Sequence, residues 1–229
     1  MARECAWVAA TLTARDIGRA ARVLDAGCAT GRYAQALGDH GYRVTGIDRA
    51  WELLAVAHGR GVRCAAADLA ALPLRRAFGG VLCRGVLNDV LDDDARRAVL
   101  RAFAGALTAG GVLVLDVRDW DATLRRKSAE PVHERTVETE RGRLTFRSET
   151  RLEVPTRRML IAERHALTRG GDTHEAMHDF VMRCWTRDEL QQRLGEAGFV
   201  SVECRGAYDD AVPLGATDRI VAVAGMLRT

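Results

Sequence analysis

Short apolar runs alternate with segments of helical periodicity between residues 22 and 118 of the chain. Strands of a parallel sheet are covered on both faces and read as nearly continuous apolar runs, whereas the covering helices show apolar residues at every third or fourth position. Such strands are expected at residues 23–26, 44–48, 62–67, 80–85 and 112–117. The alternation predicts an α/β fold built on a doubly wound, mostly parallel sheet.

The periodicity changes to alternation in the segment that follows the fifth expected strand. Residues 143–154, 159–167 and 173–184 alternate in this way, and short turns around Pro155 and Gly170 separate them. Runs of period two joined by short turns predict an antiparallel meander. We therefore expect residues 119–185 to form an antiparallel β insertion that lies over the acceptor side of the site.

The two ends of the chain complete one expected domain, residues 1–229. Thr186 and Glu189 have the spacing of a capping box, which begins a helix that ends at Gly198. Strands at 200–204 and 220–223 are expected to close the sheet as an antiparallel pair. The expected parts are a short N-terminal helical lid (1–21), a ligand-binding half (22–118), the insertion (119–185) and the C-terminal helix and strands (186–229).

Composition supports a single core and narrows the range of partners. The chain has 229 residues, of which 48% are hydrophobic, and its formal net charge is +3. Only one of its 34 basic residues is a lysine, Lys127, and the arginines are scattered among 31 acids. Because no basic run follows a strand or helix, a nucleic-acid partner is not expected.

The six cysteines lie far apart without a C-x-x-C pair, which is the pattern of buried free thiols. The sequence shows no signal peptide and no apolar run of about 18 residues, so we expect a cytoplasmic protein without a membrane partner. The sequence leaves open whether the protein is a monomer or a homodimer.

One stretch joins an apolar strand to a turn of small residues that begins a helix. The strand at 23–26 leads into Gly27, and Gly31 begins the helix. Glycines in such a turn let the backbone approach a ligand, and the helix N-terminus points toward it. Asp48 ends the next strand about 20 residues later, where a carboxylate accepts both ribose hydroxyls of a nucleoside. The stretch predicts a nucleoside site, and tight packing of the glycines is the alternative.

Residues 25–31 (DAGCATG) resemble the first motif of the class I S-adenosylmethionine-dependent methyltransferases, with Ala29 in place of the family's middle glycine. The resemblance implies a seven-stranded Rossmann-like sheet and S-adenosyl-L-methionine as cofactor. It also implies that Asp68 accepts the adenine amino group and that Leu69 covers the ring, whereas a helix cap is the alternative role of Asp68. The cofactor-binding residues expected on this basis are Asp25, Gly27, Cys28, Ala29, Gly31, Asp48, Arg49, Asp68, Leu69 and Cys83.

Residues 115–121 (LDVRDWD) resemble the segment after the fifth strand of glycine N-methyltransferases and related small-amine methyltransferases. In that family the arginine holds the acceptor's carboxylate, and the resemblance implies this role for Arg118, whose fork fits a carboxylate. An ion pair with Asp119 or Asp121 is the alternative. Glycine itself is not favoured as acceptor, because Gly85 is followed by valine rather than the family's asparagine. The acceptor-binding residues expected are Arg84, Asn88, Arg118, Trp120 and His174.

Residues 174–178 (HEAMH) match the H-E-x-x-H pattern of zinc hydrolases. The metal-binding form of that pattern requires a helix, whereas these residues lie in an alternating segment, so no metal site is expected. A strand also places His174 and His178 on one face, which is apolar apart from the two imidazoles. His178 is the candidate general base, and a hydrogen-bonded structural histidine is the alternative.

These patterns together predict an S-adenosylmethionine-dependent methyltransferase of a small molecule, and N-methylation of an amine is the favoured reaction. An amine needs only to arrive unprotonated, whereas a hydroxyl acceptor would require a base such as His178. One alternative is an O-methyltransferase of a natural product. The other is a non-catalytic protein that binds S-adenosylmethionine or another nucleoside, because a fold does not determine a function.

Overall fold

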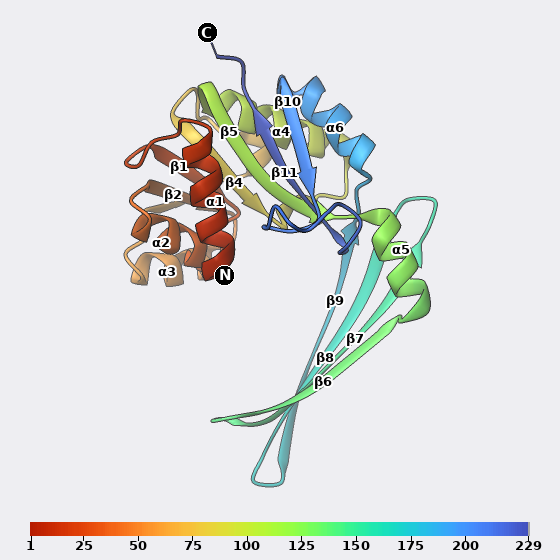
Figure 1. Ribbon diagram of the computed structural model, residues 1–229. Helices are drawn as coiled ribbons and strands as arrows, with labels where there is room; N and C mark the ends of the chain where they lie inside the picture. Colours follow the sequence, from red (N-terminus) through yellow and green to blue (C-terminus); the bar gives the residue numbers. More distant parts are fainter. Residues whose placement is uncertain (229) are drawn as a thin grey trace.

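A seven-stranded sheet is the central element of the computed structural model, which describes residues 1–228 (Figure 1). Its strand order is β10-β11-β5-β4-β1-β2-β3. The strands are β1 (Arg22–Ala26), β2 (Arg43–Asp48), β3 (Cys64–Ala66), β4 (Phe78–Arg84), β5 (Leu107–Arg118), β10 (Ser201–Arg205) and β11 (Arg219–Gly225). Strands β1 to β5 are parallel, and β11 pairs antiparallel with both β5 and β10. The predicted sheet is therefore confirmed.

Helices cover both faces of this sheet because successive residues of its strands point to opposite sides. Val23 and Leu82 belong to the apolar cluster beneath α1 and α2, whereas Leu24 and Leu113 belong to the one beneath α4 and α6. The helices are α1 (Ala2–Ala14), α2 (Arg32–Asp39), α3 (Trp51–Gly59), α4 (Asp93–Ala106) and α6 (Arg187–Glu196), with short 3-10 helices η1 (Leu69–Ala71) and η2 (Val86–Asn88).

The insertion between β5 and α6 is an antiparallel sheet of four strands in the order β6-β7-β8-β9. The predicted meander is confirmed, but the structure adds a helix and a fourth strand before it. These elements are α5 (Trp120–Ala129), β6 (Val132–Thr139), β7 (Gly142–Glu153), β8 (Arg158–Arg169) and β9 (Asp172–Arg183). Figure 1 shows this sheet extending away from the seven-stranded sheet, so its outer half does not form the roof that the sequence suggested.

Helix α5 covers the base of one face of the insertion. Trp120 of α5, Met159 and Ile161 of β8, and Cys184 form a small buried cluster there. The chain leaves and re-enters the domain at one place, where Asp119 forms an isolated bridge with Trp185. The insertion is thus attached to the domain at its base only.

A buried arginine holds this base in position. Arg96 of α4 is 1% exposed, and its guanidinium stacks on the Trp185 ring at 4.1 Å. Its Nε donates to the carbonyl of Val90 at 2.7 Å, and its Nη2 donates to the carbonyl of Arg183 at 2.9 Å. Because Arg183 ends β9, this side chain joins α4 to the last strand of the insertion.

The predicted capping box at the start of α6 is confirmed for its first residue. The amide of Glu189 donates to the Thr186 hydroxyl at 3.2 Å. The Glu189 carboxylate does not return to the cap but accepts hydrogen bonds from Arg157 at 2.6 Å and Arg183 at 2.8 Å. The carboxylate therefore joins α6 to the base of the insertion.

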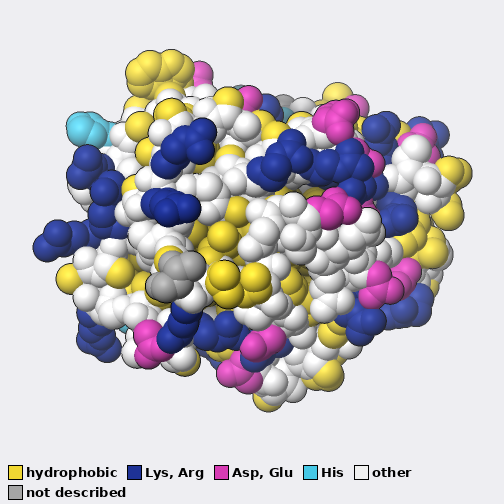
Figure 2. Space-filling view, turned by 90° about the horizontal axis from the view of Figure 1, so that it is seen from above, with side chains coloured by type: hydrophobic (Ala, Val, Ile, Leu, Met, Phe, Trp, Pro, Cys, Tyr) yellow, Lys and Arg dark blue, Asp and Glu magenta, His cyan; other side chains and the backbone are white. Residues whose placement is uncertain are grey.

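The sequence predicted arginines scattered among acids. On the face seen in Figure 2, basic side chains are interspersed with acidic ones. On helix α3, Trp51 is 73% exposed and Val56 is exposed, whereas Leu54 and Ala57 are buried. All six cysteines are free. Within residues 1–228 no helix is both long and apolar enough to cross a membrane.

Candidate functional site

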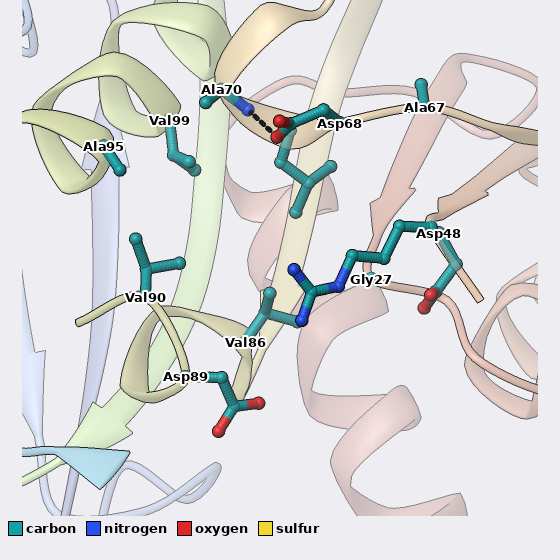
Figure 3. Close-up of a pocket in the computed structure, with 12 residues that line it drawn as sticks. Gly27, Asp48, Ala67, Asp68, Ala70, Val86, Asp89, Val90, Ala95 and Val99 are labelled. Atoms are coloured by element: carbon teal, nitrogen blue, oxygen red, sulfur yellow. Dashed lines mark hydrogen bonds between the residues drawn. The ribbon is translucent and has the colours of Figure 1, made fainter. Parts of the chain in front are cut away.

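A cavity of about 320 Å³ lies at the carboxyl ends of the central strands (Figure 3). The strand order reverses between β1 and β4, and ligands of open α/β sheets bind beside such a reversal. The cavity is lined by Gly27, Asp48, Arg49, Ala67, Asp68, Leu69, Ala70, Val86, Asp89, Val90, Ala95 and Val99. It therefore brings together five predicted cofactor-binding residues from three segments: Gly27, Asp48, Arg49, Asp68 and Leu69.

The turn after β1 adopts the left-handed conformation three times. The φ angles are 80° at Gly27, 45° at Ala29 and 74° at Gly31. A Cβ on Gly27 would lie 2.1 Å from a methyl carbon of Val86, and one on Gly31 would lie 2.9 Å from Ala57. Packing within the chain thus requires both glycines, although Gly27 also lines the cavity.

Asp48 connects this turn to the end of β2. Its Oδ2 accepts a hydrogen bond from the amide of Ala29, and its Oδ1 accepts one from the amide of Ala50, both at 2.9 Å. An ionised carboxylate has about four acceptor sites, so both oxygens retain capacity for a ligand. Asp48 lines the cavity, which is the position that the nucleoside interpretation requires.

Asp68 lies directly before η1, and Leu69 is the first residue of η1. The Asp68 carboxylate accepts a hydrogen bond from the amide of Ala70 at 2.9 Å and so caps η1, as the alternative interpretation expected (Figure 3). Asp68 and Leu69 also line the cavity, so the cap does not remove them from a ligand's reach. The adenine-binding role of this pair stays a prediction.

Asp25 is a buried acid beneath the turn. It is 3% exposed, and its Oδ2 has no hydrogen-bond partner among the described residues. Burial raises the pKa of this carboxyl to about 7, and the nearby charge of Asp48 adds to the effect. Asp25 itself does not line the cavity. The residues that do line it include Asp48, whose carboxylate oxygens can accept hydrogen bonds from the ribose hydroxyls of the predicted cofactor.

We expect the stability of the protein to fall as the pH rises through the titration of Asp25. The native state retains the proton up to pH about 7, whereas the unfolded chain releases it near 3.8, so the native state binds more protons between these values. The difference corresponds to about 4 kcal/mol lost by pH 8. Urea unfolding of Asp25→Asn should show a gain over wild type at pH 8 that shrinks at pH 5.

Asp68→Asn is the matched control for this prediction, because it makes the same chemical change at an exposed aspartate. The control should not reproduce the pH-dependent gain. If the free energy of unfolding of Asp25→Asn changes with pH in parallel with that of wild type from pH 5 to pH 8, Asp25 is not the group whose titration lowers the stability.

Sequence patterns missed Asp89, which lines the cavity from η2. Burial raises the pKa of its carboxyl, and the charge of Arg49 opposes this shift. The signal for it was weak, because Asp89 follows a 3-10 turn rather than a strand.

The structure places several of the predicted side chains away from the cavity, in roles that serve the fold. Cys83 is fully buried in the apolar core, where its pKa is raised by burial, and Cys28 is buried against Gly46. Neither cysteine lines the cavity. Trp120 is buried in the cluster at the base of the insertion. Asn88 is buried and uses both ends of its amide, donating to the carbonyl of Gly85 and accepting from the amide of Arg118, each at 2.9 Å.

Arg118 forms an ion pair with Asp218. The predicted alternative was an ion pair with Asp119 or Asp121, and the structure shows such a pair with an aspartate far along the chain instead. His174 and His178 lie in the exposed outer part of β9 and do not line the cavity. They form a strand, which lacks the helical geometry of the zinc hydrolases. Residues 1–228 contain no group of three or more candidate metal ligands.

Arg84 lies beside a polar cluster that sequence reasoning did not foresee. At the ends of β4 and β5, Asp116 is buried and accepts hydrogen bonds from the amide of Gly85 and from Arg219. On the other side, Arg84 contacts Glu4 of α1 and Tyr33 of α2. The sequence signal that could have identified Asp116 is its position as a lone acid at the end of an apolar strand.

The strand order and the position of the cavity define the fold of the class I S-adenosylmethionine-dependent methyltransferases. Two solved structures share it. The S-adenosylmethionine-bound amino pentose methyltransferase CalS10 from Micromonospora echinaspora has a TM-score of 0.76 and 26% identity, covering 99% of this chain and 90% of its own. Streptomyces venezuelae DesVI has a TM-score of 0.83 and 18% identity, covering 100% and 92%.

Residues 23–111 match the family model described as a methyltransferase domain. A ubiquinone biosynthesis O-methyltransferase of Idiomarina loihiensis is 32% identical over 112 residues. That match covers 43% of this chain and 45% of the relative, so the chain spans less than half of the length of its curated relative. The predicted class and its cofactor, S-adenosylmethionine, are confirmed.

Proposed function

We propose that this protein transfers the methyl group of S-adenosylmethionine to the nitrogen of a small-molecule amine. The observation that carries the proposal is the cavity beside the strand reversal, with Asp48 and Asp68 at its wall. The acceptor class is supported by two similar structures: the amino pentose methyltransferase CalS10, and KedS8, a sugar N-methyltransferase of Streptoalloteichus with a TM-score of 0.77 and 21% identity, covering 99% of this chain and 87% of its own.

In the proposed reaction the cofactor supplies an electrophilic methyl group on a sulfonium sulfur, and this chain supplies position. Asp48 would hold the ribose hydroxyls, and Asp68 with Leu69 would hold the adenine. Holding nucleophile, methyl carbon and sulfur in line accounts for most of the acceleration expected of such a site. An uncharged nucleophile that meets a cation disperses charge, so the site does not need a strong anion-stabilising device.

The cavity wall carries carboxylates but no histidine among the described residues, which favours an amine acceptor over a hydroxyl acceptor. Among the described residues that line it, the titratable side chains are Asp48, Arg49, Asp68 and Asp89, without a histidine. A hydroxyl acceptor would need a positioned base, whereas an amine can lose its proton before it binds. O-methylation remains the second candidate, because the curated relative is named an O-methyltransferase.

Methyl transfer to amine and hydroxyl partners tests this proposal. The purified protein is incubated with S-adenosylmethionine and matched amino and hydroxy sugars, and S-adenosylhomocysteine and methylated product are measured by mass spectrometry. Product from the amino sugar alone would support N-methylation, and product from the hydroxy sugar alone would overturn it. A protein that binds S-adenosylhomocysteine but methylates neither would support the non-catalytic alternative.

His178→Ala should leave kcat within about threefold of wild type, far from the roughly 10²–10⁴-fold loss that follows removal of a general base. The physical reason is that His178 lies in the exposed part of β9, where its ring stacks edge-on with that of His165 at 5.8 Å. Rates are measured from pH 6 to pH 10, with His165→Ala as the control for damage to this sheet. A basic limb that disappears only in His178→Ala would restore His178 as the base and favour a hydroxyl acceptor.

The homodimer, the cytoplasmic location and the absence of a nucleic-acid partner stay predictions, as does the acceptor-binding role of Arg118.

A further inference from the structure

Arg84 lies at the end of β4 that adjoins the motif turn. Cys83 is the register partner of Ala26, so Arg84 comes one residue beyond that pair, beside Gly27. The next turn places Val86 against Gly27, and both of these residues line the cavity. Arg84 therefore lies next to the motif turn, although it is not itself one of the residues that line the cavity.

Three side chains meet at this point from three different elements. The guanidinium of Arg84 lies over the ring of Tyr33, 4.7 Å from its centroid. Its Nη2 lies 3.3 Å from the Oε2 of Glu4, and the hydroxyl of Tyr33 donates to the same oxygen. The carboxylate of Glu4 is thus held by a guanidinium and a phenol, which is a fully assembled carboxylate site.

The acid in this site comes from α1, whereas its two binding residues belong to the domain. Arg84 ends β4, and Tyr33 lies in the first turn of α2, just after the motif turn. The other arginines of this edge are engaged in fixed pairs, Arg219 with Asp116 and Arg118 with Asp218. Among these three arginines, Arg84 alone has an acid partner from α1, and its buried Nε has no partner among the described residues.

We propose that Arg84 and Tyr33 bind the carboxylate of the cofactor's methionine portion, and that Glu4 competes with it for this position. The proposal rests on the proposed function, because it requires S-adenosylmethionine in the cavity. A guanidinium binds a carboxylate through charge-assisted hydrogen bonds, and exchange of one carboxylate for another leaves the local charge unchanged. The proposal therefore gives Arg84 a role in binding the cofactor, whereas the sequence predicted a role in binding the acceptor.

Two ligands distinguish binding of the cofactor's carboxylate by Arg84 from general damage to the cavity. S-adenosylhomocysteine carries the amino-acid portion, and 5′-methylthioadenosine has the same adenosine and sulfur without it. Calorimetric titration of both into Arg84→Gln should show S-adenosylhomocysteine weakened by about tenfold or more, the loss expected of a charge-assisted hydrogen bond, and 5′-methylthioadenosine unchanged. Tyr33→Phe should show the same selectivity with a smaller loss.

Glu4→Gln tests whether Glu4 competes with the cofactor, because a purely structural Glu4 would not give tighter binding when it is replaced. Removing the competing charge should tighten S-adenosylhomocysteine by about threefold or more and leave 5′-methylthioadenosine unchanged, since a neutral amide binds a guanidinium less strongly than a carboxylate does. Arg3→Gln is the matched control, because it removes a different surface pair of α1, the one with Asp209. It should change neither affinity.

The proposal is overturned if Arg84→Gln weakens both ligands equally, if it weakens neither, or if Glu4→Gln weakens S-adenosylhomocysteine. Thermal unfolding of each variant shows whether it is folded, and Arg84→Lys serves as the second variant if Arg84→Gln is not. A wild-type protein that binds both ligands with equal affinity would overturn the inference and leave the proposed function intact. A wild-type protein that binds neither would overturn both.

Discussion

Replacement of Asp48 by alanine is expected to lower the affinity for S-adenosylhomocysteine and 5′-methylthioadenosine alike, by about 10- to 100-fold. Charge-assisted hydrogen bonds of the kind proposed between Asp48 and the ribose contribute about 1.5–3 kcal/mol. Asp48 lines the cavity, and each of its oxygens already accepts one backbone amide. Titration calorimetry at constant ionic strength measures the loss. A loss within twofold for both ligands would contradict the ribose assignment.

The same variant also loosens the motif turn, since the amide of Ala29 loses its acceptor. The 2′-deoxy analogue of 5′-methylthioadenosine separates the two effects. Wild type should discriminate strongly between the ribose and deoxyribose forms, and Asp48→Ala should not. If both proteins discriminate equally, Asp48 acts by holding the turn rather than by contacting the hydroxyls.

Arg96→Met is expected to lower the free energy of unfolding by about 3 kcal/mol or more, which is the usual cost of breaking a buried charged network. Methionine retains packing on Trp185 but leaves the carbonyls of Val90 and Arg183 without their donor. Urea unfolding followed by far-ultraviolet circular dichroism measures the change. An unaltered midpoint would mean that solvent reaches these carbonyls.

Arg97→Met is the matched control, because Arg97 is the next residue of α4 and pairs with Asp94 at the surface. Surface ion pairs contribute little, so the control should cost about 0.5 kcal/mol or less. Equal losses in the two variants would show that helix α4, rather than the buried network, responds to the substitution.

The sequence predicted the large sheet well because burial on both faces leaves a strong apolar signal in each strand. It failed at α5 and β6, since neither has such a signal. Strand β6 (Val132–Thr139) is mostly exposed and contains two valines among polar residues, and α5 buries only part of one face. An element that packs on a protruding insertion carries little of the periodicity on which such predictions depend.

The residues of the candidate site also include some that the sequence predicted and some that it misplaced or missed. Asp48 and Asp68, which follow apolar strands, were predicted to lie at the site, and both line the cavity. Cys83 and Asn88 were also predicted to lie at the site, and the structure directs their side chains into the fold. Adjacent residues of a strand point to opposite sides, so a shift of one position separates a core thiol at Cys83 from a polar cluster at Arg84. Glu4 and Tyr33 were missed because tertiary contact alone brings them together.

The attachment of the insertion at its base has a consequence for how such a protein changes over evolutionary time. The outer halves of β6 to β9 contact little besides one another, and exposed positions of this kind accept substitutions at small cost in stability. The methyltransferase domain is constrained by a shared core, by tight glycines and by Asp48. Selection can therefore vary the insertion freely while it preserves the rest of the chain, and two descendants can diverge in the insertion and remain alike elsewhere.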